Sequence, residues 1–504
     1  MKACGTLLVF LGLLSPSLAA DNPAPLADYF QAQADEIAKQ PLQGIKSAEE
    51  WKAKRPEMQR RMLEMLGLWP LPEKTPLNAR VTGTLEKPDF LVEKLLFESR
   101  PGLFVTANLY RPKGQHGPLP AILYVCGHAK VEKDGVIFGN KTHYQHHAEW
   151  YAANGYVCLV VDTLQLGELP GLHHGTFQEG MWWWMTRGYT PAGVEAWNGV
   201  RAIDYLISRD EVDPKKIGVT GRSGGGATSW WLGAIDDRLA AVAPVAGITD
   251  MVPYVAGGDF AGPHKNGTVE GHCDCMFVVN TYQWDYTMIA ALCAPKPLLV
   301  ENTDEDPIFP EEGVRRVYDA LETVYGWYDA KDKLGLVIGK GGHMDTEELR
   351  HPSFAFMEKW LKGKDVEASD IEEPDRKIPN EDLKVLARGE TPQGNRNDTI
   401  HETFVPRRTP EVETGSLSKE GWEQKRREWT RNLHEKVFAG WPRESDAGSL
   451  NPEVTFDKTR EGIRLREVAF TSQEGVRLTL YLFSAEGESP AKESTLVVLN
   501  EKNW

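Results

Sequence analysis

The sequence predicts an α/β protein built on a mostly parallel sheet that helices cover on both faces. Short, continuous apolar runs alternate with helical stretches between residues 91 and 362. Runs that are apolar along their whole length, such as Ala121–Val125 and Val157–Val161, are typical of strands buried on both faces. A strand, a tight turn and a helix of small residues meet at Ser223, which adds a recognisable motif to this pattern.

Length and charge narrow the class of protein. The chain has 504 residues, which suggests more than one domain. Apolar residues make up 41% and charged residues 26%, a balance that indicates a globular protein. The net charge of -16 argues against nucleic acid or an anionic membrane as a main partner, because both require clustered Lys and Arg. The oligomeric state stays open.

Residues 1–20 have the features of a secretory signal peptide. Lys2 precedes a short apolar run, and Ser17-Leu18-Ala19 fits the small-residue rule for cleavage. The run is too short to span a membrane. We therefore predict a secreted or periplasmic protein. The mature chain would keep five cysteines, and this odd number predicts no complete disulfide framework.

The remaining elements follow in order. Residues 21–90 are predicted to form an N-terminal helical segment, in which Ser47 and the apolar spacing indicate a helix over 48–66. In the predicted catalytic domain, 91–362, strands are expected at 91–97, 103–110, 121–125, 157–161, 216–220, 240–246, 297–300 and 334–338, and helices at 146–154, 192–208 and 227–234. Charged and polar residues dominate 363–415, which we predict to be a linker or a loosely packed extension.

Residues 416–504 are predicted to be a partial repeat of the N-terminal part of the catalytic domain. Trp422–Arg426 matches Trp51–Arg55, and Phe470–Ser472 matches Phe97–Ser99, with an offset that changes only from 371 to 373 residues. The copy contains no counterpart of Ser223. We therefore expect either a reading frame that is cut short or a fragment that packs against the first domain.

Gly221-Arg222-Ser223-Gly224-Gly225 fits the nucleophile-elbow pattern G-x-S-x-G. The predicted strand before it and the predicted helix after it supply the context that the motif requires. The glycines tolerate a strained turn and allow the helix to pass close to the strand. Ser223 is therefore the predicted nucleophile.

A serine hydroxyl requires a base, and the base requires a carboxylate that orients it. His343 follows the last predicted strand across a glycine-rich loop and is the predicted base. The acid is Asp306 or Asp304, which share the loop after strand 297–300. We prefer Asp306 because the following proline fixes the direction of the turn, whereas Asp304 could brace that turn.

Five further residues are predicted to line the site. The oxyanion hole requires two N–H donors, which we assign to Gly224 and to the backbone of His128. Arg222 could bind a carboxylate or a sugar hydroxyl, or could form a structural ion pair. Trp182 and Trp183 could stack on sugar rings, or could pack in the core or a lid.

Two motifs raise the question of a metal site. The first, His143–His147, has no carboxylate or cysteine within the motif to complete a ligand set. The second, Gly271–Cys275, has ligands too close in sequence to close a tetrahedral site readily. We therefore predict no metal and, in the absence of a nucleotide-binding fingerprint, no cofactor.

Together these motifs resemble the α/β-hydrolase superfamily, and most closely the secreted bacterial carbohydrate esterases of the acetyl xylan esterase type. The resemblance covers about residues 45–365 and is carried by Val105–Pro112, Cys126-Gly127-His128, the elbow, Asp306–Pro310 and Gly342-His343. It implies a Ser-His-Asp acyl-enzyme mechanism and hydrolysis of acetyl or similar esters on plant or algal polysaccharides. Cys126 and Arg222 depart from the family pattern, which leaves the substrate open.

A serine peptidase of the prolyl-oligopeptidase kind is the alternative, because such enzymes share the fold and the triad. They gate access with a large N-terminal domain, and only about 70 mature residues precede the predicted strands here. A non-catalytic binding protein is disfavoured by the complete set of Ser223, His343 and Asp306. The expected partner is thus an esterified carbohydrate or another small ester.

Overall fold

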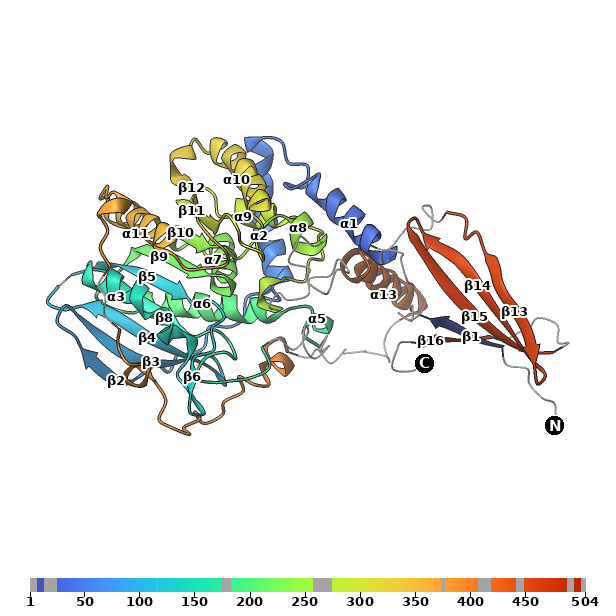
Figure 1. Ribbon diagram of the computed structural model, residues 1–504, viewed down its shortest axis with the longest axis horizontal. Helices are drawn as coiled ribbons and strands as arrows, with labels where there is room; N and C mark the ends of the chain where they lie inside the picture. The colour runs from blue at the N-terminus through green and yellow to red at the C-terminus, as the bar shows by residue number, and fades with distance from the viewer. Residues whose placement is uncertain are drawn as a thin grey trace.

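The computed structural model describes residues 7–12, 25–115, 117–173, 183–256, 274–373, 377–406, 418–440, 448–486 and 494–499. These residues form a nine-stranded sheet within a larger body, and a separate five-stranded sheet. Helices α1 (Pro25–Ala38) and α13 (Lys419–Asn432) lie between the two sheets in Figure 1.

The nine-stranded sheet has the order β12-β11-β10-β9-β5-β8-β4-β3-β2. Its strands are β2 (Arg80–Glu86), β3 (Phe90–Arg100), β4 (Leu103–Pro112), β5 (Leu119–Val125), β8 (Val157–Val161), β9 (Val212–Arg222), β10 (Leu239–Val245), β11 (Leu298–Thr303) and β12 (Leu334–Gly339). Strands β5 and β8 to β12 are parallel, whereas β2, β3 and β4 pair in antiparallel fashion. The predicted mostly parallel sheet is confirmed.

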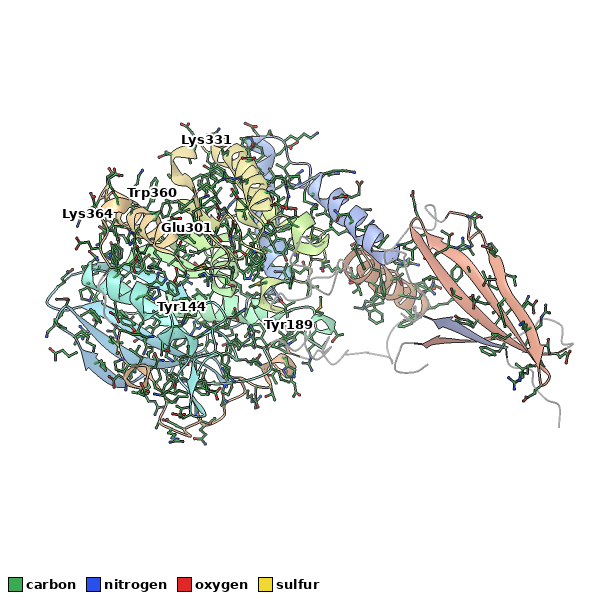
Figure 2. All side chains as sticks on the ribbon, in the orientation of Figure 1. Tyr144, Tyr189, Glu301, Lys331, Trp360 and Lys364 are labelled. Carbon is green, nitrogen blue, oxygen red and sulfur yellow. The ribbon has the colours of Figure 1, made fainter. Side chains whose placement is uncertain are left out.

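Helices cover both faces of this sheet. One face packs against α2 (Ala48–Met65), α6 (Pro191–Ile207), α7 (Gly224–Ile235), α9 (Tyr286–Ala291) and α10 (Glu311–Gly326), and the other against α3 (Gln145–Ala153) and α11 (Glu347–Lys362). Strand β5 shows why its sequence is continuously apolar: Leu123 and Val125 face the first layer, and Ile122 and Tyr124 the second. Figure 2 shows Tyr144 and Glu301, both buried, inside this body.

The N-terminal boundary of the catalytic domain differs from the prediction. Strand β2 pairs with β3 at the edge of the large sheet, so the predicted boundary at residue 90 falls inside a hairpin. The sequence did not reveal β2 because its residues are largely exposed and show no apolar alternation. The predicted helix over 48–66 is confirmed: Ser47 Oγ accepts a hydrogen bond from Glu50 N at 3.2 Å, and Trp51 is buried.

The predicted linker after residue 362 is instead docked, over much of its length, on the body that contains the nine-stranded sheet. Leu383, Val385 and Leu386 are buried. Asn108 Nδ2 donates to Leu383 O at 3.0 Å, and Asn397 pairs with the backbone N–H and C=O of Phe104. The polar composition concealed this packing because only a few apolar side chains are buried and the hydrogen bonds involve backbone groups and single amide side chains.

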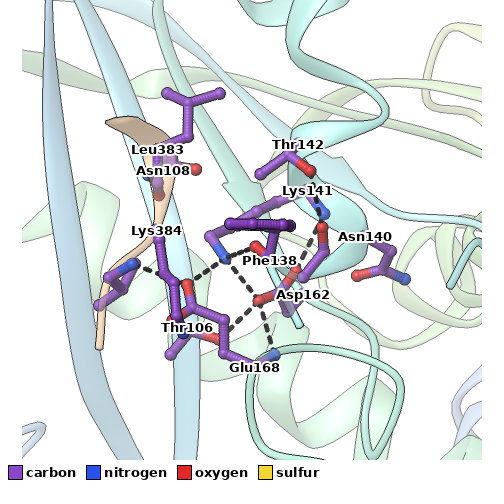
Figure 3. A network of polar contacts seen from close by, with 12 residues as sticks. Thr106, Asn108, Phe138, Asn140, Lys141, Thr142, Asp162, Glu168, Leu383 and Lys384 are labelled. Carbon is purple, nitrogen blue, oxygen red and sulfur yellow. Dashed lines mark hydrogen bonds and ion pairs between the residues drawn. The ribbon is translucent and has the colours of Figure 1, made fainter. Parts of the chain in front are cut away.

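A buried ion pair between Lys141 and Glu168 connects the docked segment to the large sheet (Figure 3). Lys141 Nζ is fully buried, 2.8 Å from Asp162 Oδ2 and 2.6 Å from Glu168 Oε1. Glu168 also accepts hydrogen bonds from the backbone N–H groups of Val385 at 2.7 Å and Leu386 at 2.8 Å. Although burial opposes ionisation, Lys141 and these amides hold the pKa of Glu168 below its usual range. The ionised carboxylate thus joins the docked segment to the body that contains the nine-stranded sheet.

The five-stranded sheet repeats the edge of the large one. Strands β13 (Glu453–Arg460), β14 (Ile463–Gln473) and β15 (Val476–Ala485) pair in antiparallel fashion, and each begins 373 residues after β2, β3 and β4 respectively. Helix α13 takes the place of α2. The order and spacing of these elements support the predicted repeat.

Strand β1 (Leu7–Gly12) completes the smaller sheet and comes from the segment that we predict to be a signal peptide. It lies antiparallel to β15 and parallel to β16 (Ser494–Leu499), just as β8 lies between β4 and β5. The pair Leu8↔Phe483 corresponds to the pair Cys158↔Tyr110. In the repeat, β1 therefore occupies the position of β8; the signal peptide stays a prediction.

Within the described ranges, no helix has both the length and the apolar character needed to cross a bilayer. The described cysteines, Cys126, Cys158, Cys275 and Cys293, are all buried, and the described residues contain no disulfide between them. Cys273 lies outside the described residues.

Candidate active site

Ser223 stands at the turn between β9 and α7. Its φ of 59° and ψ of -119° place it in a strained conformation that non-glycine residues rarely adopt. The turn is held by its backbone, since Ser223 N donates to Val245 O at 2.9 Å and Ala227 N donates to Ser223 O at 2.9 Å. A side chain at Gly225 would meet Val125 O at 2.0 Å, so only glycine lets α7 approach β5 this closely.

His343 and Asp306 lie together in the loops after β12 and β11, two neighbouring parallel strands. His343 Nδ1 is 2.7 Å from Asp306 Oδ2. Asp306 Oδ1 accepts from Ile308 N at 2.8 Å and from Phe309 N at 3.1 Å. The Asp306 side chain is 2% exposed and that of His343 is 19% exposed, so the carboxylate is buried while the imidazole reaches solvent.

Asp304 has a different position. Its Oδ1 accepts from Gly341 N at 2.9 Å, and its Oδ2 lies 2.6 Å from Lys340 Nζ. The hydrogen bond from Lys340 and the amide of Gly341 hold the pKa of Asp304 below its usual range. Asp304 therefore braces the loop that carries His343, whereas Asp306 contacts the imidazole itself.

The relation between Ser223 and His343 differs from that between His343 and Asp306. The described part of the chain contains no direct hydrogen bond between Ser223 Oγ and the imidazole. Catalytic hydrogen bonds in unliganded enzymes are often long and shorten when substrate binds.

The loop Cys126-Gly127-His128 packs against the elbow. Asn140 Nδ2 donates to Gly127 O at 2.8 Å, and Thr163 Oγ1 donates to Cys126 O at 2.8 Å, which fixes the loop after β5. The imidazole of His128 lies directly against Gly224, because a side chain added at Gly224 would meet His128 Cε1 at 2.4 Å. The two residues predicted to form the oxyanion hole are thus adjacent.

Arg222 has no carboxylate partner among the residues that the structure describes, and its Nη2 is buried there without a hydrogen bond. The ion pair that the sequence left open is therefore not found in these residues. Its guanidinium acts on Tyr144 instead: burial raises the pKa of the Tyr144 hydroxyl, and Arg222 opposes the rise. The positive charge of Arg222 thus lies one residue from the nucleophile and is paired with no carboxylate of the described residues.

The two predicted aromatic contacts are not placed. Trp182 lies outside the described residues; Trp183 begins α5 (Trp183–Thr186), and its side chain lies outside them too. The next residue, Trp184, is buried against Tyr189 and His401. Stacking on sugar stays a prediction for Trp182 and Trp183.

Two groups of possible metal ligands flank the site, and the sequence predicted neither. In the first, Asp345 Oδ2 lies 3.2 Å from His146 Nε2 and 3.0 Å from His147 Nε2. Burial lowers the pKa of His147 to about 4 although Asp345 opposes the change, and the two histidines hold the pKa of Asp345 well below its usual value despite burial.

The second group joins His128, His173, Glu195 and Cys275. Burial raises the pKa of Glu195 to about 8, and hydrogen bonds from Thr228 and Cys275 oppose the rise. The four residues come from four separate elements, so no sequence motif contains more than one of them. The sequence pointed to Cys275 through a motif considered for a metal and to His128 through the predicted oxyanion hole, but to neither His173 nor Glu195.

Comparisons with known proteins agree with this fold. Residues 102–285 match the family model described as X-Pro dipeptidyl-peptidase (S15 family). The Bacillus subtilis (strain 168) protein named "Putative hydrolase YtaP" is 25% identical over 61% of this chain and all of its own length. Carbohydrate esterase MZ0003, from an unknown prokaryotic organism, is 30% identical over 26% of this chain and 33% of its own.

A solved structure, Methylesterase BT1017, is 21% identical with a TM-score of 0.51, over 79% of this chain and 81% of its own. At this identity the likeness concerns the fold. The chain has the α/β-hydrolase fold, and its relatives by sequence indicate a hydrolase.

Proposed function

We propose that the chain is a secreted serine esterase that removes acetyl groups from plant or algal polysaccharides. The single observation that carries the proposal is the pairing of His343 Nδ1 with Asp306 Oδ2 at 2.7 Å, on two loops at the same end of the sheet as the Ser223 elbow. This arrangement has the chain order Ser, Asp, His that α/β-hydrolases use.

In the proposed mechanism, Ser223 Oγ attacks the ester carbonyl while His343 Nε2 takes the serine proton. Asp306 accepts from His343 Nδ1, which fixes the tautomer and stabilises the imidazolium. The N–H groups of Gly224 and His128 receive the negative charge of the tetrahedral intermediate. His343 then protonates the leaving sugar hydroxyl, and an acyl group stays on Ser223.

Deacylation repeats these steps with water as the nucleophile. His343 takes a proton from water, the hydroxide attacks the acyl carbonyl, and Ser223 leaves with the proton from His343. The products are a carboxylic acid and the free enzyme. The short path from His343 to solvent, given by its 19% exposure, supports the entry of water at this step.

The carbohydrate assignment is supported by the sequence similarity to a carbohydrate esterase. Arg222 adds a positive charge beside the nucleophile, which suits a sugar that carries hydroxyl or carboxylate groups near the ester. In an acetyl ester the sugar supplies the alcohol, whereas in a methyl ester of a uronic acid the sugar supplies the carboxylic acid. Assays with both kinds of substrate therefore show which side of the ester bond the enzyme recognises as sugar.

A serine peptidase is the second candidate, favoured by the match to the dipeptidyl-peptidase family model over residues 102–285. That match includes Ser223 but neither Asp306 nor His343. The test is an assay of the purified full chain on acetylated xylan, methyl esters of uronic acids and aminoacyl-proline amides. We expect release of acetate; cleavage of the amides without any ester turnover would contradict the proposal.

A further inference from the structure

We propose that His128, His173, Glu195 and Cys275 bind one zinc ion beneath the nucleophile elbow. Their four ligand atoms, two imidazole nitrogens, a carboxylate oxygen and a sulfur, all lie within 4.8 Å of one another. This donor set, with both nitrogen and sulfur, is one that zinc accepts in closed tetrahedral sites.

The distances agree with a tetrahedral ligand set. His128 Nε2 lies 3.2 Å from His173 Nε2 and 3.2 Å from Cys275 Sγ, and His173 Nε2 lies 3.9 Å from Glu195 Oε1. With zinc–nitrogen bonds of about 2.0 Å and zinc–sulfur bonds of about 2.3 Å, neighbouring ligands in a tetrahedron are roughly 3.3 to 3.6 Å apart. A central ion thus fits with small side-chain adjustments.

The ligand set is deeply buried. Glu195 and Cys275 are 5% and 0% exposed, and a divalent cation would compensate the negative charge that each carries when it binds a metal. Glu195 Oε1 has no N–H or O–H donor within hydrogen-bond distance in the described part of the chain, which leaves this oxygen available to a metal.

Helix α7, which begins immediately after Ser223, supports the ligands from outside. Thr228 Oγ1 donates to Glu195 Oε2 at 3.1 Å, and Trp231 Nε1 donates to Cys275 O at 3.4 Å. Outer hydrogen bonds of this kind orient the ligands of metal sites. The nucleophile and the proposed site therefore share one helix.

The alternative cluster fits a metal less well. His146 and His147 both contact the same oxygen of Asp345, whose Oδ1 lies 3.7 Å from Arg350 Nη1. Hydrogen bonds and an ion pair account for this geometry, and three ligands with an arginine beside them do not form a closed site.

The proposed role is structural. Four protein ligands leave no open position, so the ion would not activate water. It would hold the loop after β5, the loop after β8, α6 and the short helix η3 (Asp274–Met276) together. Because the His128 imidazole lies against Gly224, the ion would also fix the amide that we propose for the oxyanion hole; this consequence rests on the proposed function, whereas metal binding does not.

The test is the metal content of the untagged full chain, purified without chelators and measured by mass spectrometry of the elements. We expect about one zinc per chain, and less than about 0.1 in Cys275→Ser and Glu195→Gln. Cys293→Ser, a buried cysteine elsewhere, and His147→Gln, in the alternative cluster, are matched controls that should keep the metal. A metal-free chain that takes up no added zinc would overturn the proposal, as would loss of zinc from His147→Gln alone.

Cobalt substitution of the wild-type chain keeps the proposal testable if the variants fail to fold. A thiolate ligand gives cobalt a charge-transfer absorption in the near ultraviolet, and we expect this band from Cys275. Tetrahedral visible bands without the charge-transfer band would exclude Cys275 as a ligand and overturn the proposal. Both readouts are independent of ester hydrolysis, so an inactive chain that binds zinc would refute only the proposed function.

Discussion

His343 Nδ1 lies 2.7 Å from Asp306 Oδ2, while the other oxygen of Asp306 accepts hydrogen bonds from the backbone amides of Ile308 and Phe309. The carboxylate therefore cannot rotate without breaking two amide contacts. This arrangement separates Asp306 from Asp304, which the same loop carries two residues earlier.

Replacing Asp306 with Asn should lower kcat by roughly 10³- to 10⁴-fold, because an amide no longer fixes the productive tautomer of His343. The matched change, Asp304→Asn, removes an exposed contact with Lys340 and should alter kcat by less than about threefold. The two variants are compared by their steady-state rates on an acetyl ester, and circular dichroism verifies that both are folded. The reverse order of effects would assign the acid to Asp304.

Replacing Glu168 with Ala should reduce the free energy of unfolding by about 3 to 5 kcal/mol, because it leaves the buried charge of Lys141 with only one carboxylate partner. It should also release residues 377–406, since Val385 and Leu386 donate to this carboxylate. Chemical denaturation and limited proteolysis measure the two effects.

Lys384→Ala is the control for Glu168, because Lys384 Nζ contacts the same carboxylate but its side chain is partly exposed. We expect a loss of about 1 kcal/mol or less from this change. Equal losses in the two variants would show that the buried lysine does not determine the stability of this region.

Acid should destabilise the fold through His147. Burial holds its pKa near about 4 in the folded chain, against an ordinary value of 6.5, so the unfolded chain binds more protons between these values. The contribution of His147 to the free energy of unfolding is therefore fully present above about pH 6.5. It decreases by up to roughly 1.4 kcal/mol per pH unit as the pH falls toward 4. The carboxylate of Asp345, whose pKa is depressed, contributes its own loss only at lower pH.

The measurement is urea unfolding of wild type and His147→Gln across this pH range. The variant should show a flatter dependence on pH, and His434→Gln, an exposed histidine, should resemble wild type. If the two slopes for wild type and His147→Gln were the same, the titration would belong to other groups.

The N-terminus of the secreted chain should begin at Ala20 or Asp21, because the small residues before these positions fit signal cleavage. Cleavage removes β1 and opens the edges of β15 and β16 in the smaller sheet. The intact mass of the secreted protein shows where its N-terminus lies. A secreted chain that keeps Leu7–Gly12 would show that β1 is a permanent strand.

Much of this fold could be predicted because buried parallel strands are continuously apolar. Val157–Val161 was predicted with its observed bounds, and the elbow at Ser223 with its strand and helix. Strand β2 could not be predicted because it is an exposed edge strand without apolar alternation. The docking of residues after 377 could not be predicted because it depends on Glu168, a residue more than 200 positions away in the sequence.

The carboxylate of the proposed triad and the proposed metal ligands also depend on contacts that the sequence alone does not reveal. Sequence order placed Asp304 and Asp306 in one loop, but only the path of the backbone determines which carboxylate reaches His343. His128, His173, Glu195 and Cys275 come from four elements, so no spacing rule connects them. The close spacing of possible ligands around Cys275 led to the prediction of no metal, and the residues that surround Cys275 in the structure lie far from it along the chain.

The most direct test of nucleophilic catalysis by Ser223 is the capture of an acyl-enzyme on this residue. The full chain is mixed rapidly with an activated acetyl ester, quenched in acid, digested and analysed by mass spectrometry. We expect acetylation of the peptide that contains Ser223, and no acetylation in Ser223→Ala, whose ester turnover should fall by at least about 10³-fold. Undiminished turnover in Ser223→Ala, or acetyl transfer to a different residue at the same rate, would contradict the role of Ser223 as the nucleophile.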